Sequence, residues 1–396
     1  MLRLEARPEP SRAMSMASPL IALAITVVIG TLLFVVLGKD PLRGLGVFFV
    51  EPLKGAYALS ELAIKATPLL LIALGLAVCF RSNIWNIGAE GQFVLGAIFA
   101  SGVAMQATKD TGHWIFIAVL AASVVGGMLW AAIVAFLRDR FNASEILVSL
   151  MLVYVAEQLL NYFVYGPWKD PHGYNFPQTV TFLKSTQVPR LFDTYRINIG
   201  AVGALVAVGA FWVLLFRTYA GFQLQVGGLA PAAARYAGFS ARRALWTTML
   251  VSGGMAGLAG GLEVAGPLNQ LTPHVPAGYG FAAIIVAFVG RLHPVGIVFS
   301  AILMSMFYIG GELSQSRLGL PQSLTGVFQG LLLLALLACD TLIAYRVRWR
   351  TGVAGAAATS SSASPPAASA PATSELDDAP LSPVVATSAL PARKGS

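Results

Sequence analysis

Charged residues are scarce in this sequence. Asp, Glu, Lys and Arg make up 11% of its 396 residues, against about 25% in an ordinary soluble domain. Hydrophobic residues make up 56%, and the mean hydropathy is +0.72. A soluble globule could not cover its surface with so few charges, so the composition excludes a water-soluble enzyme, a disordered protein and a nucleic-acid binder. It predicts an integral membrane protein.

Motifs for catalysis and metal binding are also missing. The only two cysteines, Cys79 and Cys339, lie in apolar segments and form neither a disulfide framework nor a metal site. The four histidines are scattered, and no H-E-x-x-H, phosphate loop or G-x-S-x-G nucleophile elbow occurs. We therefore expect no catalytic residue, no metal and no cofactor bound by this chain. Transport is the expected role of such a protein.

Long apolar runs are what the sequence does contain. They predict an all-α, polytopic helical bundle of about ten transmembrane helices, some of them broken or re-entrant, in contact with membrane lipid. The region 280–312 allows two divisions: two spans, or a re-entrant piece and one span. The predicted spans are 19–38, 62–80, 91–108, 113–137, 146–166, 197–216, 245–265, 280–290, 294–312 and 323–343.

The distribution of Lys and Arg predicts the orientation. Lys and Arg exceed Asp and Glu by eight. If the chain crosses the membrane ten times from a cytoplasmic N-terminus, most of the loops on the outer side contain few Lys and Arg residues. This bias predicts that both termini are cytoplasmic. The chain then divides into a cytoplasmic segment, 1–18, a transmembrane domain, 19–345, and an Ala/Ser/Pro-rich tail, 351–396, which we expect to be disordered.

Polar residues interrupt the apolar pattern between Phe80 and Phe93. Trp85, Asn86, Glu90 and Gln92 lie there with two glycines that loosen a helix. Such side chains beside the membrane core are costly unless they face a cavity or one another. One interpretation is that they line the substrate pathway. The alternatives are an ordinary cytoplasmic turn, or a structural role in holding a broken helix.

This stretch resembles a known family. Asn86-Ile-Gly-Ala-Glu-Gly-Gln92, followed by Leu95-Gly-Ala97, is similar to a motif of permease subunits of bacterial ABC importers for nucleosides and simple sugars, relatives of the branched-chain amino acid permeases. The resemblance covers roughly 20–345 and favours the nucleoside branch. It implies that the chain forms half of a pathway that carries nucleosides or related simple sugars inward.

The resemblance also implies partners and a location. ATP would be hydrolysed by separate ABC ATPase subunits. A second permease subunit, a related but different chain, would complete the pore, and an extracytoplasmic substrate-binding protein would deliver the solute. The chain would lie in the bacterial inner membrane. On this interpretation Trp85 could stack on a base, and Asn86, Glu90 and Gln92 could bind the ribose or the base edges.

The predicted cytoplasmic loop 217–244 contains a short Ala-rich segment. Pro231 suits the first turn of a helix and Gly238 suits its end. The segment resembles the loop through which ABC permeases couple to their ATPases, which implies that role for Pro231, Ala233, Ala234, Arg235 and Gly238. It departs from that pattern at Ala230, Ala232 and Gln225.

Glycines recur at close spacing in the predicted span 245–265. Gly253, Gly257 and Gly261 are four residues apart, which allows close helix packing in lipid, within the subunit or between subunits. A second Gly/Pro-rich break follows at 266–280. Paired breaks in the two halves of a transporter indicate a site between them.

Acidic residues within the spans are candidates for function. Glu157 and Asn161, one helical turn apart, are assigned to the substrate pathway, and Glu263, Glu312 and Asp340 lie in or near other spans. An alternative to the ABC permease is an ion-coupled secondary transporter of a small polar solute, with Glu157 and Glu263 as ion carriers. A membrane-embedded enzyme would need a polar constellation that the sequence does not contain.

Overall fold

The computed structural model describes residues 2–6, 12–108, 110–112, 114–173, 175–321 and 323–349. Residues 3–348 form one compact unit. The predicted tail, 351–396, lies outside the described residues, as do residues 1 and 7–11 of the predicted N-terminal segment.

A helical membrane protein is confirmed. Within the described residues, eight helices are long and apolar enough to cross a membrane. They are α1 (Arg12–Val36), α3 (Ala56–Arg81), α5 (Ile115–Phe141), α6 (Glu145–Tyr165), α7 (Ile199–Arg217), α10 (Ala241–Glu263), α12 (Pro294–Leu318) and α13 (Ser323–Ala344).

Two of the ten predicted spans are shorter helices. They are α4 (Ala89–Ala104) and α11 (Tyr279–Val289), of 16 and 11 residues, whereas crossing the hydrocarbon takes about 20. The region 280–312 therefore divides into one short helix and one full span. Polar backbone at the ends of short helices must be satisfied by the protein itself, which makes these ends the places to look for organised polar groups.

Smaller elements connect the long helices. The prediction of an all-α chain needs one addition, because two five-residue strands pair with each other. The connecting elements are α2 (Pro41–Leu45), η1 (Gly46–Val50), η2 (Glu51–Leu53), α8 (Tyr219–Leu229), α9 (Pro231–Tyr236), η3 (Val264–Leu268) and the strands β1 (Leu2–Ala6) and β2 (Tyr345–Trp349).

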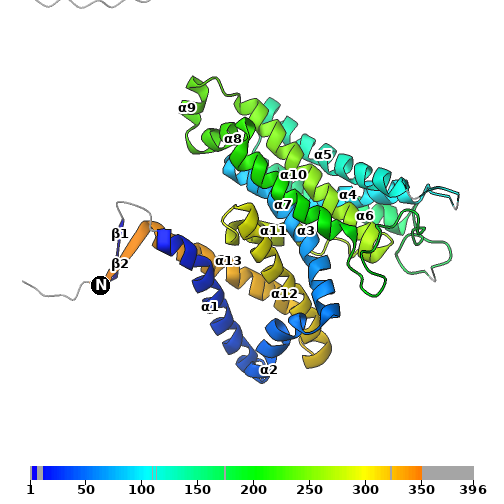
Figure 1. Ribbon diagram of the computed structural model, residues 1–396, viewed down its shortest axis with the longest axis horizontal. Coiled ribbons are helices and arrows are strands. Elements are labelled where there is room, and N and C mark those ends of the chain that lie inside the picture. The colour runs from blue at the N-terminus through cyan, green and yellow to red at the C-terminus, as the bar shows by residue number, and fades with distance from the viewer. Residues whose placement is uncertain are drawn as a thin grey trace, which may run out of the picture. The chain divides into compact units, whose positions relative to one another are not determined.

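Helix α10 is the centre of the packing. It contacts α3, α4 and α5, while α1 packs on α13, and α11 and α12 pack on α3 (Figure 1). Glycines set the closest approaches. A Cβ on Gly257 would overlap the carbonyl oxygen of Ser123 and lie 2.9 Å from Cα of Gly127. The helices therefore meet backbone to backbone, with no room for a side chain between them.

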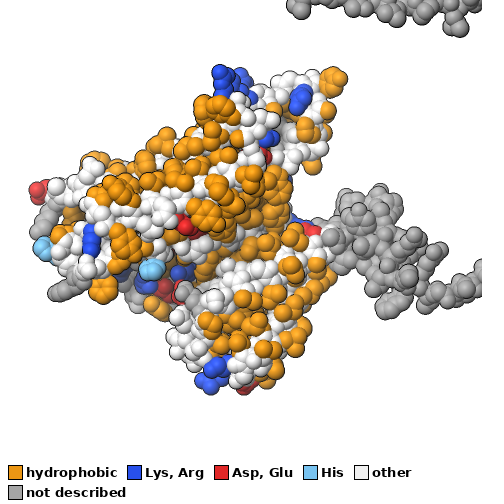
Figure 2. All heavy atoms as spheres, turned by 180° about the vertical axis from the view of Figure 1, so that it is seen from behind, with side chains coloured by type: hydrophobic (Ala, Val, Ile, Leu, Met, Phe, Trp, Pro, Cys, Tyr) orange, Lys and Arg blue, Asp and Glu red, His pale blue; other side chains and the backbone are white. Residues whose placement is uncertain are grey.

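The outward faces of most long helices are apolar. On α1, α5, α7 and α13, the exposed positions away from the helix ends carry apolar residues or glycine. Figure 2 shows hydrophobic side chains spread widely over the visible face. Such faces suit contact with lipid tails.

A matched pair of glycine substitutions tests this packing. We expect Gly257→Ala to lower the free energy of unfolding by about 1–3 kcal/mol, because the new methyl group has no space in the core. Gly209→Ala on α7, where a Cβ meets nothing within 4 Å, should be neutral or stabilising, because Ala favours the helix by up to about 1 kcal/mol. Thermal unfolding of the purified protein in detergent measures both, and equal melting temperatures for the two variants would contradict the packing.

Candidate functional site

A seven-residue break separates α3 from α4. Helix α3 ends at Arg81, and Asn83 adopts the left-handed conformation with φ of 56°, which Asn tolerates better than most residues. The amide of Ile84 then donates to the Cys79 carbonyl at 3.0 Å. The chain then continues as irregular backbone, exposed at Asn83 and Trp85 and buried at Asn86 and Gly88, before α4 begins at Ala89.

A pair of buried amides holds this break. Asn86 Nδ2 donates to Gln92 Oε1 at 2.9 Å, and Gln92 Nε2 donates back to Asn86 Oδ1 at 3.1 Å. The same Asn86 donates to Ser252 Oγ of α10 at 3.0 Å and accepts from the Gly88 amide at 3.1 Å. Both amide side chains have no exposed surface. Their hydrogen bonds tie the start of α4 to its own backbone and to α10.

Glu90 connects the first break to the second. Its carboxylate accepts hydrogen bonds from the amides of Gly278, at 2.9 Å, and Gly280 at the start of α11. Glu90 lies in the first turn of α4 and is 1% exposed. One carboxylate thus sits at the N-termini of two short helices, where the helix dipoles favour negative charge. The predicted pairing of the two breaks is therefore a direct contact.

Gly280 permits that contact. A Cβ at this position would overlap the backbone nitrogen of Glu90, and Gly278 has a positive φ of 76°. Ser149 of α6 adds support by accepting from the Ile87 amide at 3.2 Å. Ser149, Ser252, Gly278 and Gly280 are site residues that the sequence analysis missed. Only the Gly-rich composition of 266–280 gave a signal for any of them.

Trp85 lies apart from the amide pair. Its ring stacks on Phe288 of α11 at 6.2 Å and packs on Phe80 at 5.3 Å, and 37% of the side chain is exposed. Nearby, Arg81 Nε donates to the Leu292 carbonyl at 2.9 Å. The structure therefore places Trp85 in an aromatic contact between the ends of α3 and α11.

Glu157 and Asn161 lie on α6, and both are half-buried. Neither makes a hydrogen bond or ion pair to another residue in the part of the chain that the structure describes. They are not joined to Asn86, Glu90 or Gln92 by any such bond. The six residues assigned to the substrate pathway thus form two groups, one engaged within the protein and one on α6.

The predicted Ala-rich helix is α9. It projects with α8 at one end of the helices (Figure 1), and Pro231, Ala233 and Arg235 are exposed while Ala234 is 5% exposed. The helix ends at Tyr236, and Gly238, whose φ is +78°, follows the C-cap residue Ala237, two residues from the helix end.

Aromatic packing fixes α9 on α8. Phe239 packs its ring edge-on against Tyr219 at 6.1 Å and Phe222 at 6.3 Å. Gln225 is one of the residues at which this sequence departs from the coupling-loop pattern. Its side chain donates to the Leu215 carbonyl at 2.6 Å and so ties α8 to α7. Helix α8 was not predicted, and it packs against α9.

The three spaced glycines of α10 all face neighbours within the chain. A Cβ on Gly253 would overlap Ala131 of α5, one on Gly257 would overlap Ser123, and one on Gly261 would overlap the Ser123 side chain. The structure thus places these glycines inside the subunit.

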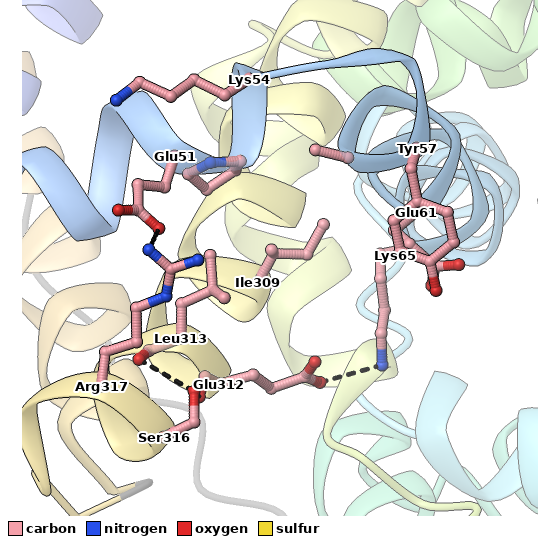
Figure 3. A pocket seen from close by; sticks show the side chains of 12 residues that line it. Glu51, Lys54, Tyr57, Glu61, Lys65, Ile309, Glu312, Leu313, Ser316 and Arg317 are labelled. Carbon is pink, nitrogen blue, oxygen red and sulfur yellow. Dashed lines mark hydrogen bonds and ion pairs between the residues drawn. The ribbon is translucent and has the colours of Figure 1, made fainter.

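A charged cavity of about 750 Å³ opens between α3, α12 and the η2 segment, at the end of α3 away from α9. Lys65 pairs with Glu312 at 3.2 Å, and Arg317 pairs with Glu51 (Figure 3). Beside it, Glu61 pairs with Arg196 at 3.3 Å. The sequence predicted Glu312 as a candidate but gave none of these partners, which lie far away along the chain.

A second ionic cluster lies at the opposite end of the helices. Arg291 donates to both carboxylate oxygens of Asp340, at 3.1 and 2.8 Å, and Ser18 donates to Asp340 at 2.6 Å. Burial, followed by the nearby Arg81 charge, lowers the pKa of His293. The neutral imidazole Nδ1 accepts from the Val295 amide at 3.3 Å and caps α12.

Among the described residues, no group of three His, Cys, Asp or Glu side chains could hold a metal ion.

Residues 58–337 match the family described as branched-chain amino acid transport system / permease component. A glucose ABC transporter permease protein of Haloferax volcanii is 31% identical, over 87% of this chain and 93% of the relative. A guanosine ABC transporter permease protein of Bacillus subtilis is 29% identical, over 80% and 91%. A nucleoside ABC transporter permease protein of Lactococcus lactis subsp. cremoris is 28% identical, over 78% and 87%. No solved structure matches this chain significantly.

Removal of the Glu90 carboxylate tests its structural connection. We expect Glu90→Ala to lower the melting temperature in detergent and to speed hydrogen exchange of the Gly278 and Gly280 amides. The reason is that the half-buried Gly278 amide and the buried Gly280 amide lose their acceptor, at a cost of about 1–3 kcal/mol for the buried one. Glu90→Gln keeps one acceptor oxygen, so its melting temperature and its exchange rates should lie between those of the parent chain and those of Glu90→Ala. The control is Asp193→Ala at an exposed loop position. Unchanged exchange in Glu90→Ala would contradict the connection.

Proposed function

The chain belongs to the branched-chain amino acid transport permease family, and from that premise we propose that it imports nucleosides or related simple sugars as the membrane subunit of an ATP-binding cassette importer. The observation that carries the proposal is the family match over 58–337, because it covers every element from α3 to most of α13. The exposed helix α9 supports it, since a small-residue helix can enter a groove on a partner.

The partners follow from this role. Two ATPase subunits hydrolyse ATP, and this chain binds none itself. Their movement on ATP binding reaches the permease through α9, with Pro231, Ala233, Ala234, Arg235 and Gly238 forming or shaping the contact surface. A second permease chain completes the pore, and an extracytoplasmic substrate-binding protein delivers the solute to the end of the helices away from α9. Both termini and α9 then lie on the cytoplasmic side of a bacterial inner membrane.

Two of the relatives reported above have guanosine or nucleoside in their names, and one has glucose. A nucleoside combines the hydroxyl groups of a sugar with a flat base, so a pathway suited to one shares chemistry with a pathway suited to the other. The motif between Asn86 and Gln92 favours the nucleoside branch.

Uptake by intact cells tests the substrate class. We expect deletion of this gene to abolish uptake of radiolabelled nucleosides, and unlabelled nucleosides alone to compete in the parent strain. Ribose, free nucleobases and branched-chain amino acids serve as competitors of other classes. If the deletion abolished uptake of only a sugar or an amino acid, the chain would still be an importer subunit, but the assignment to nucleosides would be overturned.

Substitution at the end of α9 tests the coupling role. We expect Gly238→Val to abolish transport and transport-linked ATP hydrolysis while the protein still accumulates in the membrane. The reason is that the position has a φ of +78°, which a β-branched residue cannot adopt without strain. The control is Gly227→Val on α8, where a Cβ also meets nothing within 4 Å and φ is not positive. Uptake at the parent rate by Gly238→Val would overturn the role of this turn.

A further inference from the structure

Beside the exposed apolar residues Leu147, Met151 and Val155, α6 exposes a row of polar side chains, which α1, α5, α7 and α13 do not have away from their ends. Tyr154, Gln158 and Tyr162 follow one another at intervals of four residues and form one ridge, here called the α6 stripe. Tyr154 is 58% exposed and Tyr162 is 65% exposed, and Gln158 is exposed between them. The opposite side of α6 packs inward through buried residues, namely Ser149, Val153, Ala156, Leu160 and Val164.

The depth of this stripe makes its polarity costly in lipid. Tyr154 is near the middle of α6, which begins at Glu145 and ends at Tyr165. At comparable exposure, α5 presents Leu129 and α7 presents Val206. Polar side chains at this depth face a protein partner or a water-filled cavity rather than lipid. Since the stripe is exposed on this subunit, water or another polar surface must cover it.

Two further polar groups lie beside the stripe. Asn161 and Glu157 are half-buried on one flank of it, with no hydrogen bond or ion pair to another described residue. By contrast, the side-chain amides of Asn86 and Gln92 already form hydrogen bonds within the protein, and the Glu90 carboxylate accepts from backbone amides at the start of α11. Glu157, Gln158 and Asn161 of α6 are therefore polar groups that remain free to bind a solute.

We propose that the α6 stripe is a wall of the solute pathway that contacts a nucleoside. The ring of Tyr154 stacks on the flat base, because an aromatic face can stack on any base. Tyr162 continues the same wall toward the end of α6. The amides of Gln158 and Asn161 and the carboxylate of Glu157 bind ribose hydroxyls and base edges. The stripe extends over about 12 Å at 1.5 Å per residue, so a ring and its attached sugar are contacted together. This inference rests on the proposed function.

Cysteine labelling of the assembled importer in lipid nanodiscs is the direct test. Tyr154→Cys and Gln158→Cys are each treated with a water-soluble, charged thiol reagent that reacts with the thiolate, which forms in water but not in lipid. The native Cys79 and Cys339 are buried and give a low background. Leu129→Cys on α5, 54% exposed in the subunit, is the matched control for a lipid-facing position.

We expect both stripe cysteines to react at least tenfold faster than Leu129→Cys. Guanosine, adenosine or uridine at millimolar concentration should slow the labelling several-fold. Labelling as slow as that of the control would show that lipid or protein covers the stripe, which overturns the proposal. Fast labelling that none of the three nucleosides slows would show a water-filled surface without nucleoside contact, which also overturns it.

Uptake in cells separates this inference from the proposed function. Uptake of radiolabelled guanosine, adenosine or uridine by cells with the parent chain would support the proposed function. No uptake of any of the three would overturn the proposed function itself. Given such uptake, we expect Tyr154→Ala and Gln158→Leu to lower the rate at saturating solute at least tenfold, with unchanged membrane abundance. Leu129→Ala should transport at the parent rate, and Tyr154→Phe, which keeps the ring, should lose less activity than Tyr154→Ala. Parent-like uptake by Tyr154→Ala and Gln158→Leu would refute the α6 contact alone.

Discussion

The need to satisfy polar backbone inside a membrane protein governs the centre of this structure. Two short helices, α4 and α11, begin within the bundle, and each N-terminus carries amides that no helical carbonyl can reach. One carboxylate, Glu90, meets the start of both helices and accepts from Gly278 and Gly280. Without it, the buried Gly280 amide and the half-buried Gly278 amide would lose their acceptor, and the start of α11 would be held against α4 by packing alone, as between Tyr279 and Phe93.

The polar residues of the chain divide by what they contact. Asn86, Gln92 and Glu90 are buried and bind other parts of the chain, so their chemistry maintains the broken helices. The residues of the α6 stripe are exposed and have apolar counterparts on the other helices. Both sets are polar residues in apolar surroundings. Burial distinguishes the first set, which holds the broken helices in place, from the second set, which is exposed and can contact a solute.

Most of the fold follows from composition and periodicity, but the site does not. Long apolar runs predict the helices, and Pro231 and Gly238 predict the bounds of α9 closely. The sequence also marks Asn86 to Gln92 as unusual. Asn86 and Gln92 pair with each other six residues apart, but the partners that join these residues to other helices lie 166 residues away, at Ser252 for Asn86, and 190 away, at Gly280 for Glu90. No pattern within a window of helical length can find such contacts, and so the same residues were equally compatible with binding a solute or holding the fold.

The α6 stripe and the ion pairs show the same limit. Tyr154 and Tyr162 read as ordinary members of an apolar run, because hydropathy does not say which face of a helix has a neighbour. Lys65 with Glu312, and Arg291 with Asp340, join helices that adjacency in sequence does not relate.

The glycine contacts of α10 have a consequence for motion. Where backbones meet at Gly127, Gly253 and Gly257, the surfaces are interlocked, and a small slip of one helix past the other would bring carbonyl oxygens into Cα atoms. Helices α4, α5 and α10 must therefore travel as one rigid body through any transport cycle. Any displacement must then occur between this body and the helices packed around it, among them α3, which contacts α10.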